Sequence, residues 1–239
     1  MILSGQTIDE AHYEVSAIER MTATIVEVWL RPLAKQIAFQ SGQYVLVEDA
    51  DRQVAPRSYS PANAPRPDGE LSLLVTRVPG GSTSSWFHNQ LRMGDEVILA
   101  GPYGDFGARQ TSASRLYLAA GSGIAPIRAL VETGLKIAPD RPATVIFSAR
   151  TSAEVLSRDL FLDWQAAHRQ FRFVAVLTGE DRGMRVPERL PEICPDLADH
   201  ELFIAGPPGF ILASAGAAEA LGAACECIHS EPFFAESRV

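Results

Sequence analysis

The sequence predicts two domains, an all-β domain followed by an α/β domain, and three observations support this prediction. Short apolar runs broken by Gly, Pro and Asp fill roughly the first hundred residues, which is typical of a small barrel or sandwich. Further along, apolar runs alternate with helical patterns, and this indicates a parallel sheet covered on both faces. The length of 239 residues suits two small domains. We expect them at residues 1–110 and 111–239, with the change near the polar stretch Gly107–Arg115.

The first domain is expected to hold short strands and one helix. Its strand candidates are rich in Val, Ile, Leu and aromatic residues, and they read YEVSAIER, ATIVEVWLR, GQYVLVED, ELSLLVTRV and DEVILAGP. The helix candidate, STSSWFHNQLRM, begins with hydroxyl residues suited to N-capping and is followed by Gly94.

The second domain is expected to alternate strands with helices. Its strand candidates are RLYLAAG, ATVIFSAR, FRFVAVLTGE, HELFIAGP and CECIHSE. Its helix candidates are APIRALVETGLKIA, SRDLFLDWQAAHR and GFILASAGAAEALGA. Because ligands of such sheets bind at the carboxyl ends of the strands, we look for binding residues in the turns that follow them.

Composition excludes several functions. The formal net charge of −8 makes nucleic acid a poor partner, because phosphate binding needs a basic surface. No apolar run approaches the ~20 residues of a membrane helix, and the N-terminus lacks the pattern of a secretory signal, so we expect a cytoplasmic protein without a membrane partner. The three cysteines suit neither a disulfide framework nor a metal site, and we expect buried thiols and no metal.

The stretch RSYSPA (Arg57–Ala62) groups a cation, a ring and two hydroxyls behind an apolar run. On a strand, alternation places Arg57 and Tyr59 on one face and Ser58 and Ser60 on the other. Such an arrangement could hold a flat ligand that bears a phosphate. The alternative is a polar strand end without a ligand.

Three glycine-containing turns precede helix candidates. GSGIAP (Gly121–Pro126) is a partial match to the Rossmann fingerprint, where glycines let the backbone approach a phosphate at a helix start; the alternative is a tight turn. PGGSTSSW (Pro79–Trp86) fits the same physics, although hydroxyl capping alone explains it. AGPPGF (Ala205–Phe210) falls at the same sheet edge as GSGIAP, so these two turns would flank a ligand.

In order, RSYS, GGSTS, GSGIAP, AGPPG and the final HSEPFF resemble the ferredoxin–NADP reductase superfamily. The stretch RSYSPANAPRPDGELSLLVTRVPGG is most similar to the NADH-dependent reductase components of bacterial oxygenases, such as methane monooxygenase and ring-hydroxylating dioxygenases. The resemblance runs from about residue 12 to the end of the chain. It implies an FAD-binding antiparallel β-barrel followed by a Rossmann-like NAD(P)-binding domain.

The resemblance implies roles for residues of the first domain. Arg57 would pair with a flavin phosphate, which suits a guanidinium fork. Tyr59 would stack on the isoalloxazine, and Ser60 would hydrogen-bond flavin N5, the atom that receives the hydride. The full implied set is Arg57, Ser58, Tyr59, Ser60, Leu74, Val75, Thr76, Gly81, Ser82, Thr83 and Ser84.

In the second domain, the resemblance implies contacts with NADH, or with NADPH if Arg150 reads a 2′-phosphate. Glu231 aligns with an acidic residue near hydride transfer, and Phe233 with an aromatic beside the flavin. The implied cofactor-binding set is Gly121, Ser122, Gly123, Ile124, Ala125, Pro126, Arg150, Gly206, Pro207, Pro208 and Phe233.

Two features depart from the family. Ala205 stands where a cysteine commonly precedes GPP, and no plant-type iron–sulfur motif C-x4-C-x2-C is present. We therefore expect an FAD-dependent NAD(P)H oxidoreductase whose acceptor is a separate ferredoxin or oxygenase component. Two alternatives are a reductase that releases reduced flavin to a monooxygenase, and an electron-transfer subunit without turnover of its own.

Overall fold

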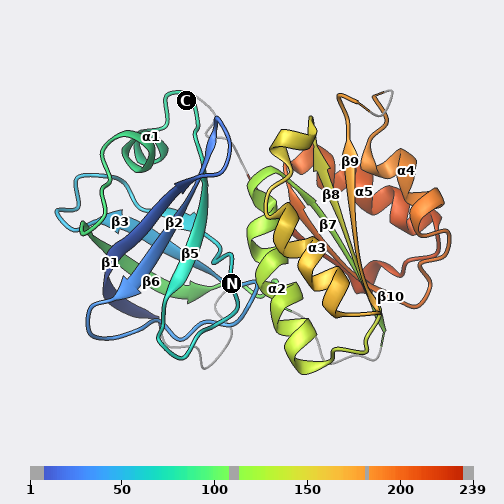
Figure 1. The fold of residues 1–239 in the computed structure, drawn as a ribbon, viewed down its shortest axis with the longest axis horizontal. Helices are drawn as coiled ribbons and strands as arrows, with labels where there is room; N and C mark the ends of the chain where they lie inside the picture. The colour runs from blue at the N-terminus through green and yellow to red at the C-terminus, as the bar shows by residue number, and fades with distance from the viewer. Residues whose placement is uncertain (1–7, 108–112, 181–182, 234–239) are drawn as a thin grey trace. The chain divides into compact units, whose positions relative to one another are not determined.

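The computed structural model describes residues 8–107, 113–180 and 183–233, which form two compact units (Figure 1). Each unit is built on its own sheet, one of six strands and one of five. The domain boundary predicted near residue 110 falls within residues 108–112, outside the described residues.

The first unit is an antiparallel barrel in which strands from both ends of its sequence become neighbours. The strand order is β4-β3-β6-β1-β2-β5, and every pair is antiparallel. Its elements are β1 (Asp9–Arg20), β2 (Ile25–Pro32), β3 (Tyr44–Asp49), β4 (Arg57–Tyr59), β5 (Leu71–Thr76), helix α1 (Ser82–Asn89) and β6 (Glu96–Tyr103).

Strands β4 and β5 are the two ends of this sheet, and a single bridge between Pro61 and Leu73 nearly closes it into a barrel. Alternate residues point inward and form the core, in which Tyr13, Val45 and Val97 are fully buried. The strand pattern alone left a barrel and a sandwich open, and the structure confirms the antiparallel barrel that the family resemblance implies. Closure leaves fewer unpaired strand edges exposed to solvent.

The second unit has a parallel sheet with the order β11-β10-β7-β8-β9. Its strands are β7 (Ser114–Ala120), β8 (Ala143–Ala149), β9 (Phe171–Leu177), β10 (His200–Gly206) and β11 (Ile228–Pro232). Its helices are α2 (Ile124–Ile137), α3 (Arg158–Ala167), α4 (Val186–Ile193) and α5 (Pro208–Ala220), with short 3-10 turns η1 (Gly121–Gly123), η2 (Ser152–Glu154) and η3 (Cys225–Cys227).

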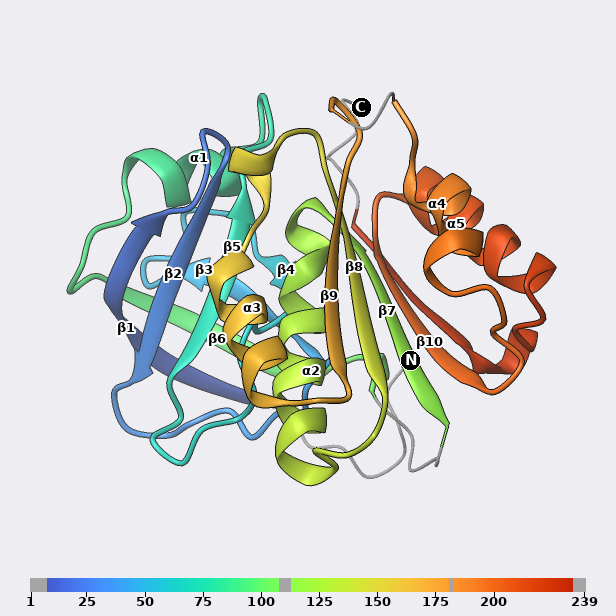
Figure 2. The same ribbon diagram turned by 45° about the vertical axis from the view of Figure 1, so that its right-hand side comes forward.

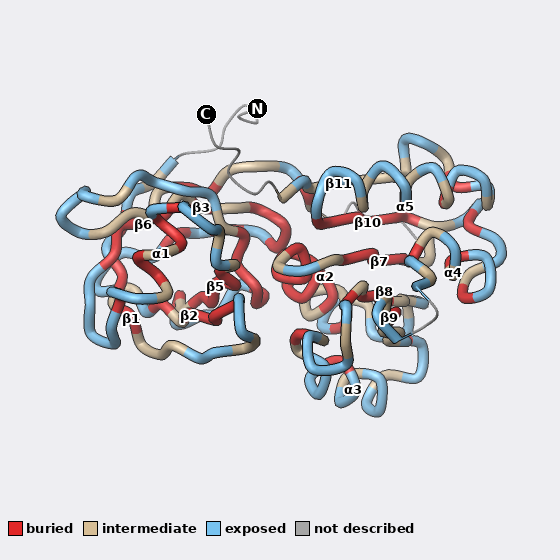
Figure 3. Tube along the Cα trace, turned by 90° about the horizontal axis from the view of Figure 1, so that it is seen from above, coloured by how far each residue is buried: buried red, intermediate tan, exposed pale blue. Residues whose placement is uncertain are grey.

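Helices cover both faces of the parallel sheet, as the alternating pattern predicts. Helices α2 and α3 lie on one face and α4 and α5 on the other (Figure 2). The inner strands β7 and β10 are therefore almost wholly buried (Figure 3). Because all five strands are parallel, their carboxyl ends and the turns that follow share one edge. None of the described helices is long and apolar enough to cross a membrane.

The structure differs from the sequence expectation in some details. The last strand candidate, CECIHSE, begins too early, because Cys225–Cys227 form the turn η3 and β11 begins at Ile228. Helix α4 is missing from the prediction because Pro187 and Pro191 break its apolar pattern, yet Pro187 lies in the first turn, where proline is tolerated. The expectation of buried thiols is wrong for Cys225, which is exposed, while Cys194 and Cys227 are half-buried. Cys225 donates to the Glu219 carboxylate over 3.3 Å, and this raises the pKa of the thiol.

Candidate functional site

The RSYS stretch forms the short strand β4 and the turn after it. Tyr59 lies opposite Val45 and Arg57 opposite Val47 on the neighbouring strand β3. Directly opposite residues share a face, and both valines are fully buried, so Arg57 and Tyr59 lie on the face of β4 that continues the barrel interior. Tyr59 is half-buried and Arg57 is exposed. The structure thus places the cation at the mouth of the barrel.

The two serines of the stretch differ in their surroundings. Ser58 lies opposite Leu46 on the other face of β4 and is exposed. Ser60 follows the strand and is only 4% exposed. Ser60 therefore lies at the point where the chain leaves β4 and crosses to β5 through the bridge at Pro61.

Helix α1 begins at the second glycine-containing turn, and no side chain among the described residues caps its start. The Thr83 hydroxyl donates to the Ala55 carbonyl over 2.8 Å, and the Ser84 hydroxyl accepts from the Val78 amide over 3.1 Å. The hydroxyls that suggested a self-capped helix are thus used elsewhere. The first-turn amides of α1 remain available to an anion, which the positive end of the helix favours.

Three contacts bring β4, α1 and the end of β5 together. The hydrogen bond from Thr83 to Ala55 places the helix start two residues from Arg57. The rings of Tyr59 and Phe87 meet edge to face with centroids 5.2 Å apart. His88 Nε2 lies 3.0 Å from the Val75 carbonyl oxygen. In β5, Leu74 and Val75 are buried and Thr76 is half-buried.

The state of His88 follows from this contact. A carbonyl only accepts hydrogen bonds, so Nε2 carries the proton and Nδ1 does not. Nδ1 is buried and has no hydrogen-bond partner among the residues that the structure describes. Burial lowers the pKa of His88, as do the charges of Arg20 and Arg77, while the Val75 carbonyl acts in the opposite direction. The neutral imidazole therefore links α1 to β5 at neutral pH.

In the second unit, the turns GSGIAP and AGPPG lie against each other at the carboxyl edge of the sheet. A methyl group at Gly123 would lie 2.4 Å from the Ala205 carbonyl oxygen and 2.7 Å from the Gly206 nitrogen. Gly121 has φ +57°, which glycine adopts without strain. Gly121 is exposed and Ser122 half-buried, while the rest of the turn, Gly123, Ile124, Ala125 and Pro126, is buried.

The last strand brings the C-terminal residues to the same edge. Glu231 on β11 pairs in register with Ala205 on β10, and the Phe233 amide donates to the Gly206 carbonyl over 2.9 Å. Glu231 and Phe233 are half-buried. At the start of α5, Pro207 and Pro208 are exposed. These residues therefore lie at the same carboxyl edge of the sheet as the GSGIAP turn.

The turn after β8 carries Arg150 and Glu154, and Glu180 from the turn after β9 contacts it. Glu154 accepts from the Arg150 amide over 3.2 Å, and Glu180 accepts from the Ser152 amide over 3.1 Å. The Gly179 amide donates to the Arg150 carbonyl over 2.8 Å. The Arg150 side chain is exposed. This end of β8 therefore presents one cation beside two anions.

A cluster of buried polar side chains contacts the last strand, β11. Glu201 is 3% exposed and pairs with Arg115 at 3.3 Å and His229 at 3.5 Å. Beside it, burial raises the pKa of Tyr117 to about 12. Since His229 lies on β11, two residues before Glu231, the cluster fixes the strand that carries the acidic residue.

Sequence reasoning named the groups at both sites but missed the side chains that hold their backbones. His88, Glu154 and Glu180 carry no local motif. A signal existed for Glu154, because Rossmann domains often place an acidic residue after the second strand, whereas Glu180 follows the third. His88 offered none, since its role depends on a contact with a distant strand.

Two family models match the chain, one after the other along the sequence. Residues 15–107 match the family model of the oxidoreductase FAD-binding domain, and residues 117–215 match that of the oxidoreductase NAD-binding domain.

Among curated proteins, the chain is 34% identical over 232 residues to the xylene/toluene monooxygenase electron transfer component of Pseudomonas putida. That match covers 92% of this chain but 64% of the relative, so the chain spans less than two thirds of it. It is 32% identical to the reductase subunit of an aromatic O-demethylase from an Amycolatopsis species, covering 89% of this chain and 69% of the relative.

Among solved structures, the Amycolatopsis cytochrome P450 reductase GcoB superposes with a TM-score of 0.88 at 28% sequence identity. The superposition covers 95% of this chain and 71% of that chain.

Proposed function

The chain belongs to the ferredoxin reductase-like family of FAD- and NAD-binding oxidoreductases, and we propose that it passes electrons from NADH through FAD to a separate acceptor protein. The observation that carries this proposal is the convergence of β4, the start of α1 and the end of β5 in the first unit. It offers a cation, a ring and open helix amides to one ligand.

FAD fits the residues of the first unit. The amides at Ser82, Thr83 and Ser84 lack a side-chain cap and suit the pyrophosphate, while Arg57 adds a charge that can fork onto a phosphate. The Tyr59 ring, which packs edge to face against Phe87, would stack on the isoalloxazine. We assign the pyrimidine edge to the backbone of residues 74–76 and flavin N5 to the Ser60 hydroxyl.

NADH fits the carboxyl edge of the second unit. Gly123 leaves no room for a side chain beside Ala205, and such a bare backbone at a helix start is where a pyrophosphate binds. We assign the nicotinamide to the neighbourhood of Gly206, Pro207 and Pro208, with Glu231 in register beside them.

The turn after β8 favours NADH over NADPH. A 2′-phosphate would meet the carboxylates of Glu154 and Glu180, which accept from the amides of Arg150 and Ser152. Like charges repel, whereas a ribose hydroxyl can donate to a carboxylate. We expect a higher kcat/KM for NADH than for NADPH, and a preference for NADPH would contradict this assignment.

The bound flavin supplies the redox chemistry, and the residues of the chain bind and orient the cofactors. Ser60 holds its hydroxyl in a buried position. Tyr59 would keep water from the flavin ring, and Glu231, in register with Ala205, would place a carboxylate beside the turn that we assign to the nicotinamide. No general acid, metal or nucleophile of the chain is required for a hydride transfer.

We propose a separate iron–sulfur protein or oxygenase component as acceptor. The relatives named above include an electron transfer component and a reductase subunit, and both descriptions fit a protein that passes electrons to another component. The test is NADH-dependent reduction of a ferredoxin and of free flavin by the purified chain. Fast reduction of the ferredoxin is expected, and fast reduction of free flavin alone would contradict this acceptor.

A second candidate is a flavin reductase that releases its product to a monooxygenase. Ala205, fully buried where the family commonly has cysteine, favours it. The open start of α1 opposes it, because a pyrophosphate site predicts tightly held FAD. Loss of flavin during dialysis would favour release.

We place this activity in the cytoplasm, where reduced nicotinamide coenzyme is produced. Fractionation of cells that produce the protein tests this, and recovery in the membrane or an exported fraction would contradict it.

A further inference from the structure

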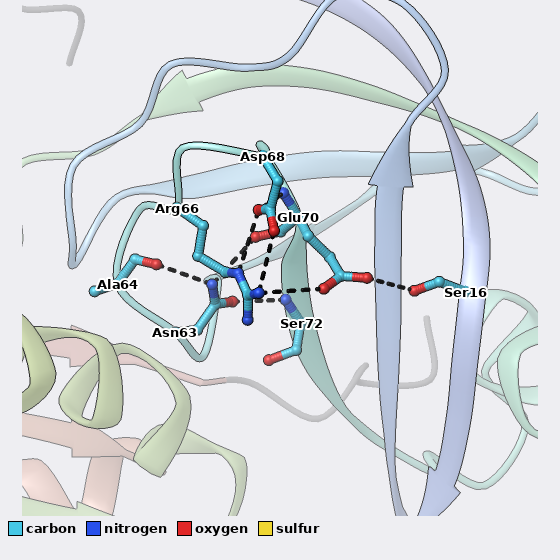
Figure 4. A network of polar contacts seen from close by, with 7 residues as sticks. All are labelled: Ser16, Asn63, Ala64, Arg66, Asp68, Glu70 and Ser72. Carbon is cyan, nitrogen blue, oxygen red and sulfur yellow. Dashed lines mark hydrogen bonds and ion pairs between the residues drawn. The ribbon is translucent and has the colours of Figure 1, made fainter.

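The seam that closes the barrel contains a buried amide side chain with no role in the site described so far. Asn63 is 6% exposed and lies three residues after Ser60 on the segment that crosses from β4 to β5. Its oxygen accepts from the Ser72 amide over 2.7 Å. Its nitrogen donates to the Ala64 carbonyl over 2.9 Å and the Glu70 carbonyl over 3.2 Å. Both amide hydrogens and the oxygen are therefore used (Figure 4).

These bonds continue the sheet where the backbone ladder stops. Pro61 bridges Leu73, and the Ala62 amide donates to the Ser72 carbonyl over 2.8 Å. At the next position the side chain of Asn63, in place of a backbone carbonyl, accepts from the Ser72 amide. Asn63 thus sets the register of the crossing segment on β5, where a shift by one residue would turn every side chain to the other face.

Further bonds hold the same loop. The Ser16 hydroxyl donates to the Glu70 carboxylate over 2.9 Å, and Asp68 accepts from the Glu70 amide over 3.0 Å (Figure 4). Arg66 pairs with Asp68 and lies over the ring of Trp29. The Glu70 carbonyl that Asn63 contacts is therefore itself fixed to β1 and β5.

Both segments assigned to the flavin ring border this seam. Ser60 immediately precedes the crossing segment, and residues 74–76 immediately follow the bridged Leu73. We propose that Asn63 is the positioning residue of the flavin site, because it sets the Ser60 hydroxyl and the β5 backbone at a fixed separation. This inference rests on the proposed function.

The first test replaces Asn63 by alanine in the full chain with FAD bound. We expect kcat for ferricyanide reduction to fall by about 10- to 100-fold, since a misplacement of about 1 Å has such an effect. The KM for NADH should stay the same, because NADH is assigned to the other unit. The visible flavin spectrum should shift, because the hydroxyl and the backbone amides would move relative to the ring.

A control variant separates positioning from stability. Tyr13→Phe removes a buried hydrogen bond of 2.8 Å to the Ile37 amide in the same barrel. It should keep the flavin spectrum and kcat. If Asn63→Ala lowers only the melting temperature, as Tyr13→Phe does, Asn63 is a purely structural residue and the inference is overturned.

A second variant keeps the inference testable if Asn63→Ala does not fold. Asn63→Asp keeps an acceptor for Ser72 but aims an oxygen at two carbonyl oxygens, to which only a protonated carboxyl can donate. Its kcat relative to wild type should rise as pH falls from about 8 to about 5. A ratio independent of pH would contradict the inference. A wild-type protein that binds no flavin would overturn the proposed function as well, so the two failures are distinguishable.

Discussion

Arg57 illustrates how one residue combines exposure with a fixed position. Its strand, β4, is only three residues long and pairs with β3 alone along its length, yet the register places Arg57 opposite the buried Val47. The backbone is therefore held by the barrel, while the exposed guanidinium donates to the Pro56 carbonyl over 3.1 Å. A cation in such a place is suited to a phosphate that binds at the mouth of the barrel.

Replacing Arg57 by alanine should weaken FAD binding by about 1.5–3 kcal/mol, the range for hydrogen bonds to charged groups. This corresponds to roughly a 10- to 100-fold rise in Kd, measurable by titrating apoprotein with FAD. Arg52→Ala is the matched control, because Arg52 is an exposed arginine of the same unit that pairs with Glu10 and Glu48. Equal FAD affinity in the Arg57 variant and wild type would contradict the assignment.

At the scale of elements, the turn after β7 and the turn after β10 depend on each other. Gly123 has ordinary helical backbone angles, so its conformation does not demand glycine. Packing requires glycine instead, because the Ala205–Gly206 peptide occupies the space that a side chain at residue 123 would need. Two turns separated by some eighty residues thus form one surface.

Gly123→Ala should push this peptide aside and destabilise the protein by about 1–3 kcal/mol, as overpacking does. The KM for NADH should rise and the affinity for FAD should not change. Gly216→Ala is the control, since nothing lies near a methyl group there, and alanine in helix α5 should stabilise by about 0.5–1 kcal/mol. An unchanged KM for NADH in the Gly123 variant would remove the basis for placing the pyrophosphate here.

Helix α1 and strand β5 are joined by a contact that depends on pH. The pKa of His88 is lowered in the folded state, chiefly by burial, so the unfolded chain takes up the proton first as pH falls. Stability is therefore full above about pH 6.5 and declines below it toward the folded pKa. His200, whose Nδ1 is also buried without a partner, has its pKa lowered by burial and adds to the effect.

His88→Gln should make the melting temperature less dependent on pH between about 8 and 5. Glutamine keeps an N–H for the Val75 carbonyl but cannot take up a proton. The melting temperature should depend still less on pH when His200 is also replaced. Thermal unfolding followed by circular dichroism checks this, and an unaltered pH profile in both variants would be the contrary result.

The helices and strands differ in how far they could be predicted from the sequence. The strands of the parallel sheet and helices α2, α3 and α5 follow from apolar periodicity and from Gly and Pro at their ends. Helix α4 was hidden by its prolines. Barrel closure was implied by the family resemblance and not by the residue pattern, because it depends on Pro61 and Asn63 meeting β5, and pairing across the seam leaves no periodic signal.

The candidate sites divide in the same way. Residues that would touch a ligand occur in compact motifs, such as RSYS and GSGIAP, so the sequence indicates them. Residues that hold those motifs in place do so through distant backbone groups, as Thr83 does with Ala55 and His88 with Val75. Their residue types fit many other roles, and only the fold identifies the partner.

For the whole molecule, we expect that the chain holds FAD and that NADH reduces it. Both sets of residues lie on frameworks rich in backbone pairing, a nearly closed barrel and a fully parallel sheet. Binding groups on rigid elements keep their geometry without a ligand. We therefore expect the cofactor sites to exist before binding rather than to form on it.

The most direct test is a visible absorption spectrum of the purified and dialysed protein, recorded without oxygen before and after addition of NADH. We expect flavin bands that survive dialysis and bleach when NADH is added. A colourless protein that oxidises NADH only with added free flavin would contradict a bound cofactor, and a protein inert under both conditions would contradict the proposed function altogether.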